Sequence, residues 1–240
     1  MAVGIGGLTN IPDGRYVGRV PKSHAPNTQS LRQRLLATAF SEVYRRSFQS
    51  ASLNEIVAEA KTTKGALFHH FDGKQALGYA IVDELLAPIL NERWLAPLAD
   101  TDDPITALQK SFRRHIADDT SSGNWVYGCP MNNLAQEMSP LDEGFRARFD
   151  AMYDRWRQTV SSALERGQRA RTVRKDVDVT GAATLVVVAQ IGIWATGKHS
   201  RNAQLMIDAG EALCASLETL RAGQPKKKSR TSRNSRRNAR

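Results

Sequence analysis

The residues between 63 and 74 combine a helix cap, small side chains, an aromatic ring, two histidines and two lysines. Thr63 is a good N-cap, so the sequence predicts a helix over residues 64–71. At about 100° per residue, Leu67 and Phe71 share one inward face. The opposite face carries small, aromatic and hydrogen-bonding residues, namely Gly65, Ala66, Phe68 and His69. Such a face can enter a major groove roughly 12 Å wide and reach base edges, while lysines at the helix ends reach phosphates.

Another helix is predicted directly before this one. Ser52 and Glu55 have the spacing of a capping box, and apolar residues then recur at i, i+3, i+4 and i+7. These apolar residues are Leu53, Ile56, Val57 and Ala60. Because only a few residues separate the two helices, the sequence predicts a helix-turn-helix motif over residues 52–71.

Two flanking helices are predicted to hold this motif. Ser30 and Gln33 form a capping box before a helix whose apolar pairs recur every four residues: Leu35/Leu36, Ala39/Phe40 and Val43/Tyr44. After the motif, a helix is expected to start at Gly73, to be interrupted at Pro88 and to end near Pro97. The first helix braces the motif, and the second links it to the rest of the chain.

These residues resemble the TetR family of bacterial transcriptional regulators. The resemblance covers about residues 30–79 and is carried by the run KGALFHHF at residues 64–71, by Lys74 and by the apolar positions named above. It implies DNA contacts by residues at matching positions: Ser52, Thr63, Lys64, Gly65, Ala66, Phe68, His69, His70 and Lys74. For His70 a packed position is an equal alternative to a phosphate contact.

Three positions depart from the family pattern. Family members usually have glycine where this chain has Ser47 and Lys61, and often tyrosine where it has Phe68. A left-handed residue at Lys61 would cost about 1 kcal/mol relative to glycine. Phe68 cannot donate the phosphate hydrogen bond of a tyrosine, so it is limited to stacking or methyl contacts.

The charge of the chain is unevenly distributed. Of 240 residues, 41% are hydrophobic and 24% charged, which suits folded domains, and the net charge is +10. Residues 224–240 alone contribute +8, whereas residues 75–223 sum to −3. Basicity therefore belongs to the motif domain and the tail. The tail is expected either to add sequence-independent phosphate contacts or to be a solvated appendage.

Composition also limits where the protein acts. Cys129 and Cys214 lie 85 residues apart, which indicates neither a disulfide framework nor zinc-ligand spacing. No signal peptide is visible, and the apolar run over residues 181–197 is interpreted as a buried helix rather than a membrane span. A cytoplasmic, nucleoid-associated protein without cofactor or metal site is expected.

The expected architecture is all-α. A flexible N-terminal arm over residues 1–28 precedes a three-helix DNA-binding domain at residues 29–89. A helical ligand-binding and dimerisation domain follows at residues 90–222, and a basic disordered tail at residues 223–240. Helices of the large domain are predicted over about residues 107–118, from Ser139-Pro140 to Gly167, over 178–199 and over 203–221.

One segment has the composition of a small-molecule pocket. Residues 125–134 combine aromatic, sulfur-bearing and amide side chains, and pockets need apolar walls with few polar groups. The proposed lining is Trp125, Tyr127, Cys129, Met131, Asn132 and Asn133, with Phe149 and Trp156 from a later helix. The stripe that contains Phe149 and Trp156 is more often plain core than part of a ligand site. Cys129 is either a redox or electrophile sensor or a packed thiol, and the packed thiol is favoured because no adjacent Lys or Arg would lower its pKa.

The last helix carries a pairing pattern. Its apolar residues are spaced 4, 3, 4 and 3 apart, which favours helix pairing. Two helices from each of two subunits would then form a four-helix dimer interface. The proposed interface residues are Val187, Ile191, Trp194, Met206, Gly210, Leu213, Leu217 and Leu220.

The sequence thus favours a regulator that binds double-stranded palindromic operator DNA as a homodimer and is released by a small-molecule effector. A sequence-tolerant architectural DNA binder, driven by the basic tail, is the alternative. An enzyme is not expected, because no Ser, His or Asp falls in a catalytic motif.

Overall fold

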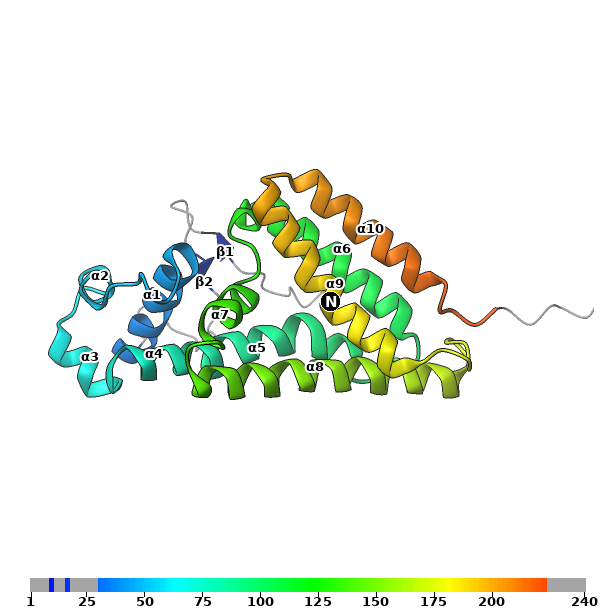
Figure 1. The fold of residues 1–240 in the computed structure, drawn as a ribbon, viewed down its shortest axis with the longest axis horizontal. Coiled ribbons are helices and arrows are strands. Elements are labelled where there is room, and N and C mark those ends of the chain that lie inside the picture. Colours follow the sequence, from blue (N-terminus) through cyan, green and yellow to red (C-terminus); the bar gives the residue numbers. More distant parts are fainter. Residues whose placement is uncertain (1–8, 11–15, 18–29, 224–240) are drawn as a thin grey trace, which may run out of the picture.

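The computed structural model describes residues 9–10, 16–17 and 30–223, and helices dominate that part of the chain (Figure 1). The N-terminal helices are α1 (Leu31–Arg46), α2 (Leu53–Glu59), α3 (Lys64–His70) and α4 (Gly73–Ile81). The larger domain contains α6 (Pro104–Ser122), α7 (Pro130–Met138), α8 (Glu143–Ala170), α9 (Val179–Ser200) and α10 (Ala203–Glu218), with a short 3-10 helix η4 (Asn124–Tyr127) before α7. The all-α prediction is confirmed.

Most of the predicted N-terminal arm and nearly all of the basic tail lie outside the described residues. Within the arm, β1 (Thr9–Asn10) pairs antiparallel with β2 (Tyr16–Val17), a pairing that the sequence did not predict.

The N-terminal helices pack as their apolar spacing predicted. Both hydrogen bonds of the Ser30 and Gln33 capping box are present, at 3.2 and 3.1 Å, and Leu67 of α3 is fully buried. The second predicted capping box is wrong. Ser52 makes no side-chain cap hydrogen bond, and the carboxylate of Glu55 pairs with Arg46 of α1 at 2.7 Å instead of reaching back to the Ser52 N–H. This ion pair ties α2 to α1.

The helix that follows the motif is not interrupted at Pro88. The backbone stays helical to Leu98 through the π-helical segments η1 (Val82–Leu86) and η2 (Asn91–Leu95), which flank α5 (Ala87–Leu90), and then the 3-10 segment η3 (Ala96–Leu98). Each π-turn closes at the residue before a proline, Ala87 and Ala96. The wider turns accommodate Pro88 and Pro97, which have no N–H and would clash with a carbonyl in a regular helix.

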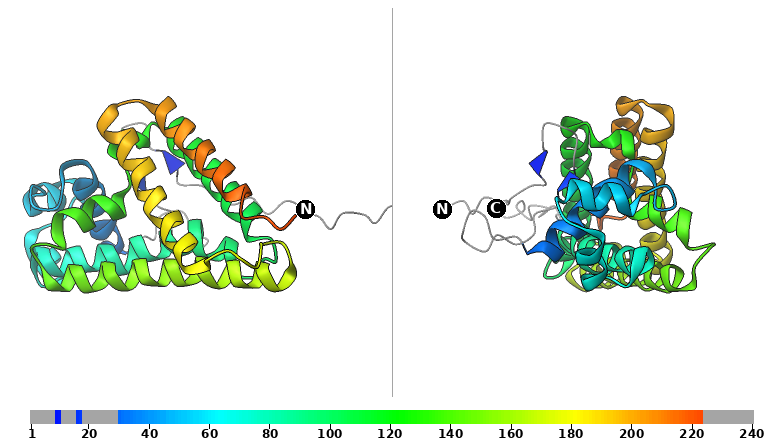
Figure 2. Two further views of the ribbon diagram at one scale, coloured as in Figure 1. Left: turned by 45° about the vertical axis from the view of Figure 1, so that its right-hand side comes forward. Right: turned by 90° about the vertical axis from the view of Figure 1, so that its left-hand side faces the viewer.

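The long helix α8 runs beside this continuous helix, while α6, α9 and α10 cross above it obliquely (Figures 1 and 2). The predicted start of α8 at Ser139-Pro140 is wrong, because those residues belong to the turn after α7. Asp142 is the cap, and its carboxylate accepts from the backbone N–H of Phe145 at 2.9 Å. Three aromatic residues of α8, Phe145, Phe149 and Trp156, are buried in the core.

The pairing pattern of α10 is satisfied inside the chain. Met206, Gly210 and Leu217 face α6 and α9, and a Cβ at Gly210 would collide with the Ile116 side chain of α6. Val187 and Trp194 of α9 are buried as well. These members of the predicted dimer interface are therefore unavailable to a second copy, since the same stripe forms the protomer's own core. Ile191, Leu213 and Leu220 are only partly buried.

The outer side of α9 carries unburied apolar side chains. Leu185 is 58% exposed and Val188 57% exposed, and Leu205 at the start of α10 is 40% exposed. By length and composition alone α9 could cross a membrane, and only 33% of its most apolar window is buried among the other helices. The side of α9 with Leu185 and Val188 is therefore an apolar surface that no other described helix of the chain covers.

Two of the three departures from the family pattern lie in left-handed backbone. Lys61 has φ 51° in the turn between α2 and α3, and Ser47 after α1 has φ 81° and ψ 161°. That combination at Ser47 is one that glycine adopts almost alone, and side chains in it are strained by about 1–3 kcal/mol. The turns keep their geometry although the chain lacks the glycines.

Replacing Ser47 with glycine is therefore expected to stabilise the protein by about 1 kcal/mol, because it relieves this strain. The Ser47 hydroxyl bonds that of Ser50 at 3.3 Å, and Ser50 has no positive φ. Ser50→Gly loses the same hydrogen bond and serves as the control, with unchanged or lower stability. Urea unfolding measures both, and equal effects of the two substitutions would refute the strain.

Candidate DNA interface and effector cavity

The helix α3 presents an exposed face to solvent, as predicted. Phe68 is 49% exposed, while Leu67 and Phe71 on the other side are buried. Of the other predicted contacts, Thr63, Lys64, Gly65 and His69 are exposed, and Ser52, Ala66, His70 and Lys74 are half-buried. The Thr63 hydroxyl accepts from the N–H of Ala66 at 3.2 Å, so the predicted cap is present. A Cβ on Gly65 would meet only the Thr63 hydroxyl, at 3.9 Å, so packing within the chain does not require glycine there.

Lys74 has an internal role that the sequence did not suggest. Its ammonium donates to the carbonyl of Gln49 at 2.9 Å and lies 5.2 Å from the centroid of the Phe48 ring. Partial burial lowers the pKa of Lys74. The side chain thus fastens the loop between α1 and α2 to α4.

The same loop is fastened to the larger domain by Glu137 of α7. Its two carboxylate oxygens accept from the backbone N–H groups of Phe48 at 2.7 Å and Gln49 at 2.8 Å. The ring of Phe48 packs against Phe145 of α8 with 5.1 Å between centroids, and a Cβ on Gly78 of α4 would collide with both rings. Phe48 is therefore held by groups from α4, α7 and α8 together.

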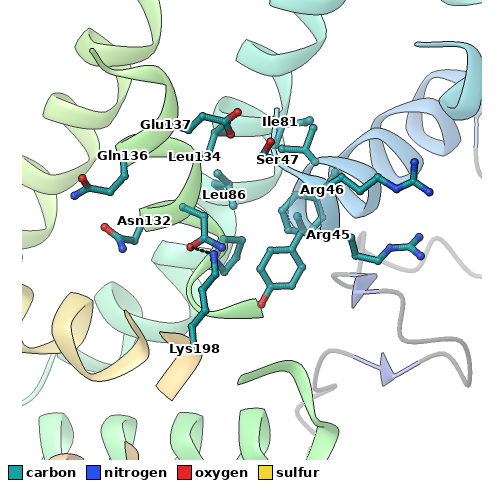
Figure 3. A pocket seen from close by; sticks show the side chains of 15 residues that line it. Arg45, Arg46, Ser47, Ile81, Leu86, Asn132, Leu134, Gln136, Glu137 and Lys198 are labelled. Carbon is teal, nitrogen blue, oxygen red and sulfur yellow. Dashed lines mark hydrogen bonds between the residues drawn. The ribbon is translucent and has the colours of Figure 1, made fainter. Parts of the chain in front are cut away.

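Another contact joins α1 to the segment before α7. The Tyr44 hydroxyl donates to the carbonyl of Gly128 at 2.6 Å, and its ring packs on Tyr127 at 5.4 Å. Between these two attachments lies a cleft of about 600 Å³ with α1 on one side and α7 on the other (Figure 3). In Figure 3, Glu137 extends toward Ser47 at one end, and Lys198 of α9 bonds Asn133 at 3.1 Å.

Behind α7 lies a second, much smaller space in the core of the larger domain. This core cavity has about 30 Å³, room for only a water molecule or two. It is lined by Leu86, Ile89, Leu90, Arg93, Trp94, Asp119, Gly128, Cys129, Pro130, Met131, Gln190 and Trp194. The N-terminal end of α7 thus separates the core cavity from the cleft of about 600 Å³ between α1 and α7, which we call the interdomain cleft.

A buried ion pair forms one wall of the core cavity. Arg93 lies 3.1 Å from Asp119, whose carboxylate also accepts from the indole N–H of Trp194 at 2.6 Å. His115 donates through Nε2 to the carbonyl of Arg93 at 2.9 Å. That carbonyl is four residues before Pro97, which has no N–H to offer it, so the histidine takes the place of the missing helical donor.

Three titratable groups near this ion pair, His115, Cys129 and Tyr153, are held neutral by burial. Desolvation lowers the pKa of His115 to about 3, with the charge of Arg93 adding to the effect. Burial raises the pKa of the Cys129 thiol and strongly raises that of Tyr153. A buried thiol held in its protonated form favours the packed interpretation of Cys129 over a reactive sensor.

The predicted pocket residues divide between the two spaces. Cys129 and Met131 line the core cavity, whereas Asn132 and Asn133 line the interdomain cleft. Tyr127 and Trp125 lie in η4 near the cleft, and Phe149 and Trp156 are buried on α8. Sequence reasoning missed most of the wall residues of the core cavity, among them Arg93, Trp94, Asp119 and Gln190, and it assigned Trp194 to the dimer interface.

Comparison with known proteins agrees with this architecture. Residues 35–81 match the family described as "Bacterial regulatory proteins, tetR family", and residues 104–213 match "Tetracyclin repressor-like, C-terminal domain". The chain is 25% identical over 195 residues to the HTH-type transcriptional repressor DhaR of Mycobacterium sp. (strain GP1), covering 79% of this chain and 96% of that protein. It is 28% identical over 137 residues to the repressor NemR of Escherichia coli, covering 57% of this chain and 68% of NemR.

Solved structures share the fold. A TetR transcriptional regulator from Chloroflexus aurantiacus superposes with a TM-score of 0.69 at 23% identity, covering 80% of this chain and 97% of that one. Reduced E. coli NemR superposes with a TM-score of 0.67 at 22% identity, covering 80% and 98%.

The helix-turn-helix domain and the helical domain behind it define a DNA-binding transcriptional regulator, not an enzyme. The chain belongs to the TetR family.

The exposed face of α3 leads to a prediction about sequence preference. His69→Ala is expected to reduce discrimination between an operator and a mutated operator by about 1–3 kcal/mol, because it removes a contact to base edges. Lys64→Ala is the matched comparison: it should weaken binding to all DNA alike and reduce the salt slope, as loss of a phosphate contact does. Competition binding distinguishes them. An unchanged preference in His69→Ala would refute the assignment of this face.

Proposed function

We propose that this protein is a homodimeric repressor that binds a palindromic operator and is released when a small molecule enters the core cavity. The observation that carries the proposal is the position of α7, which forms a wall of that cavity and also bonds the loop of the DNA-binding domain through Glu137. Its partners would be operator DNA, a second copy and the effector, in a cytoplasmic, nucleoid-associated setting.

The exposed face of α3 supports operator reading. Phe68 and His69 are available for methyl and hydrogen-bond contacts with base edges, and Lys64 for phosphate. A Cβ at Gly65 would meet only the Thr63 hydroxyl of its own chain, at 3.9 Å, so we assign the missing side chain to close approach to DNA.

Release is supported by the small volume of the core cavity. Ligand sites usually have 300–1,000 Å³, so a ligand cannot enter about 30 Å³ without moving a wall. Of the surrounding elements, α7 has the larger free space behind it, since a cleft of about 600 Å³ lies on its other side, against about 320 Å³ beside Arg93 and α6. A shift of α7 would displace Gly128 and Glu137, to which Tyr44 and the Phe48 loop are bonded. The two recognition helices of a dimer would then no longer match half-sites about one helical turn apart.

The uncovered apolar side of α9 supports dimerisation. Leu185 and Val188 are exposed on one helix, and Leu205 stands at the start of the next. A second copy that pairs the same two helices would cover all three in a four-helix arrangement, as the family implies. The proposed interface therefore uses the exposed side of α9, with Leu185 and Val188, instead of the buried side, with Val187 and Trp194, that the sequence had suggested.

Leu185→Glu together with Val188→Glu is expected to convert the dimer to monomers, because like charges would oppose each other across an apolar interface. Light scattering at micromolar concentration measures the mass. Gln158→Glu on the exposed side of α8 introduces a carboxylate elsewhere and should leave the dimer intact. A double variant of unchanged mass would move the interface away from α9.

The release model predicts that filling the core cavity mimics the effector. Cys129→Phe adds volume at the cavity wall and should push α7 toward the cleft, so operator affinity falls at least tenfold while the protein stays folded. Cys214→Phe is the control, because it overpacks the other buried cysteine, on α10, at a similar cost of about 1–3 kcal/mol. DNA binding and thermal melting are measured on both. Equal operator affinities in two equally destabilised variants would contradict the model.

A further inference from the structure

The core of the larger domain contains buried polar atoms without hydrogen-bond partners. Three of them are the hydroxyl of Tyr153, the indole N–H of Trp156 and the amide oxygen of Gln190. Trp156 and Gln190 are almost completely buried, so water cannot reach them from the surface. Leaving such groups unpaired is costly, and native proteins rarely do so without a functional reason.

These three groups belong to the surroundings of one space. Gln190 lines the core cavity directly, beside Cys129 and Trp194. The ring of Trp156 packs on Trp94, another lining residue, at 5.2 Å, and the Tyr153 ring stacks on Trp156 at 6.5 Å. Gln190 thus lines the core cavity, and Trp156, followed by Tyr153, lies behind its lining residue Trp94.

The charges at this site balance. Arg93 and Asp119 form an ion pair at 3.1 Å, and the Trp194 indole donates to the same carboxylate. His115, Cys129 and Tyr153 are uncharged near neutral pH, because burial lowers the pKa of the histidine to about 3 and raises the pKa of the thiol and of the phenol. A charged ligand would find no free counter-charge among these residues and would lose its hydration without compensation.

The surroundings of the core cavity are also aromatic. Trp94 contacts Trp156 at 5.2 Å and Trp194 at 5.9 Å, and Tyr153 extends the group along α8. Aromatic faces of this kind bind planar molecules by stacking and edge contacts. The aromatic rings thus favour a planar ligand, and the balanced charges independently favour an uncharged one.

We propose that the effector is an uncharged, planar molecule with a carbonyl or equivalent acceptor for Trp156 and Tyr153 and a hydrogen-bond donor for Gln190. This inference rests on the proposed function for the location of the site and adds the chemical class of the ligand. Binding supplies the partners that the three buried groups lack, so it offsets the work of moving α7.

Three related compounds test the ligand class on the full-length protein by titration calorimetry at pH 7. The uncharged ketone 4-aminoacetophenone has the acceptor, the donor and the ring. The anion 4-aminobenzoate has the same ring and donor but a charge, and acetophenone lacks the donor. The ketone with the amine is expected to bind at least tenfold more tightly than either of the others. Equal or tighter binding of 4-aminobenzoate, or no binding of the aminoketone, overturns the proposal.

Two substitutions test the residues. Tyr153→Phe and Gln190→Leu should each lower the affinity for 4-aminoacetophenone about tenfold, yet raise the melting temperature of the free protein by roughly 2–4 °C, because an unpaired buried group is removed. Tyr79→Phe is the control: its hydroxyl donates to Asp142 at 2.7 Å, so it should lower the melting temperature and leave the affinity unchanged. Unchanged affinity in both test variants contradicts the assignment.

Operator release is measured separately, so that the two proposals can fail independently. If 4-aminoacetophenone binds as expected but leaves the operator complex intact, the ligand class stands and the release model fails. If it does not bind while Cys129→Phe still releases operator, the ligand class fails and the release model stands.

Discussion

Both oxygens of the Glu137 carboxylate accept backbone N–H groups of the loop between α1 and α2, at Phe48 and Gln49. The position of the whole DNA-binding unit relative to the larger domain depends on this contact. Lys74 holds the carbonyl of Gln49 on the opposite side, and the Phe48 ring is packed between α4 and α8. A charge-assisted pair of hydrogen bonds on backbone atoms fixes orientation more strictly than contacts between flexible side chains do.

The short helix α7 connects this contact to the interior. One end of it, with Gly128 and Cys129 before it, borders a small, nearly filled cavity with balanced charges. Glu137 near its other end reaches the DNA-binding unit, and the open cleft lies between. Because the core cavity on one side of α7 is small and the cleft on its other side is open, α7 can move only toward the cleft when a ligand enters the cavity. That asymmetry gives the fold a way to convert ligand binding into a change of orientation.

Local sequence signals predicted the elements well where spacing and caps decide the structure. The capping box at Ser30, the buried pair Leu67 and Phe71 and the helical reading of the apolar stretch in α9 are such cases. Contacts between distant residues were not predictable in the same way. Arg46 took Glu55 from its expected cap, and Asp142 rather than Ser139 began α8.

The candidate sites show the same limit. The exposed face of α3 could be derived from helical spacing, because a single helix determines it. The stripe on α10 correctly indicated helix pairing, but spacing cannot distinguish a partner in the same chain from one in another, and α6 proved to be the partner. The walls of the core cavity come from five segments, so Arg93, Asp119 and Gln190 carry no common sequence signal.

The contact between Glu137 and the Phe48 loop is tested most directly by DNA binding of Glu137→Ala, on a duplex selected from random sequence by the unaltered protein. Amide hydrogen exchange at Phe48 and Gln49 shows whether the contact has been lost. The account predicts faster exchange at both amides and at least tenfold weaker operator binding, with random-DNA affinity unchanged. Fast exchange combined with an undiminished preference for the operator would contradict it.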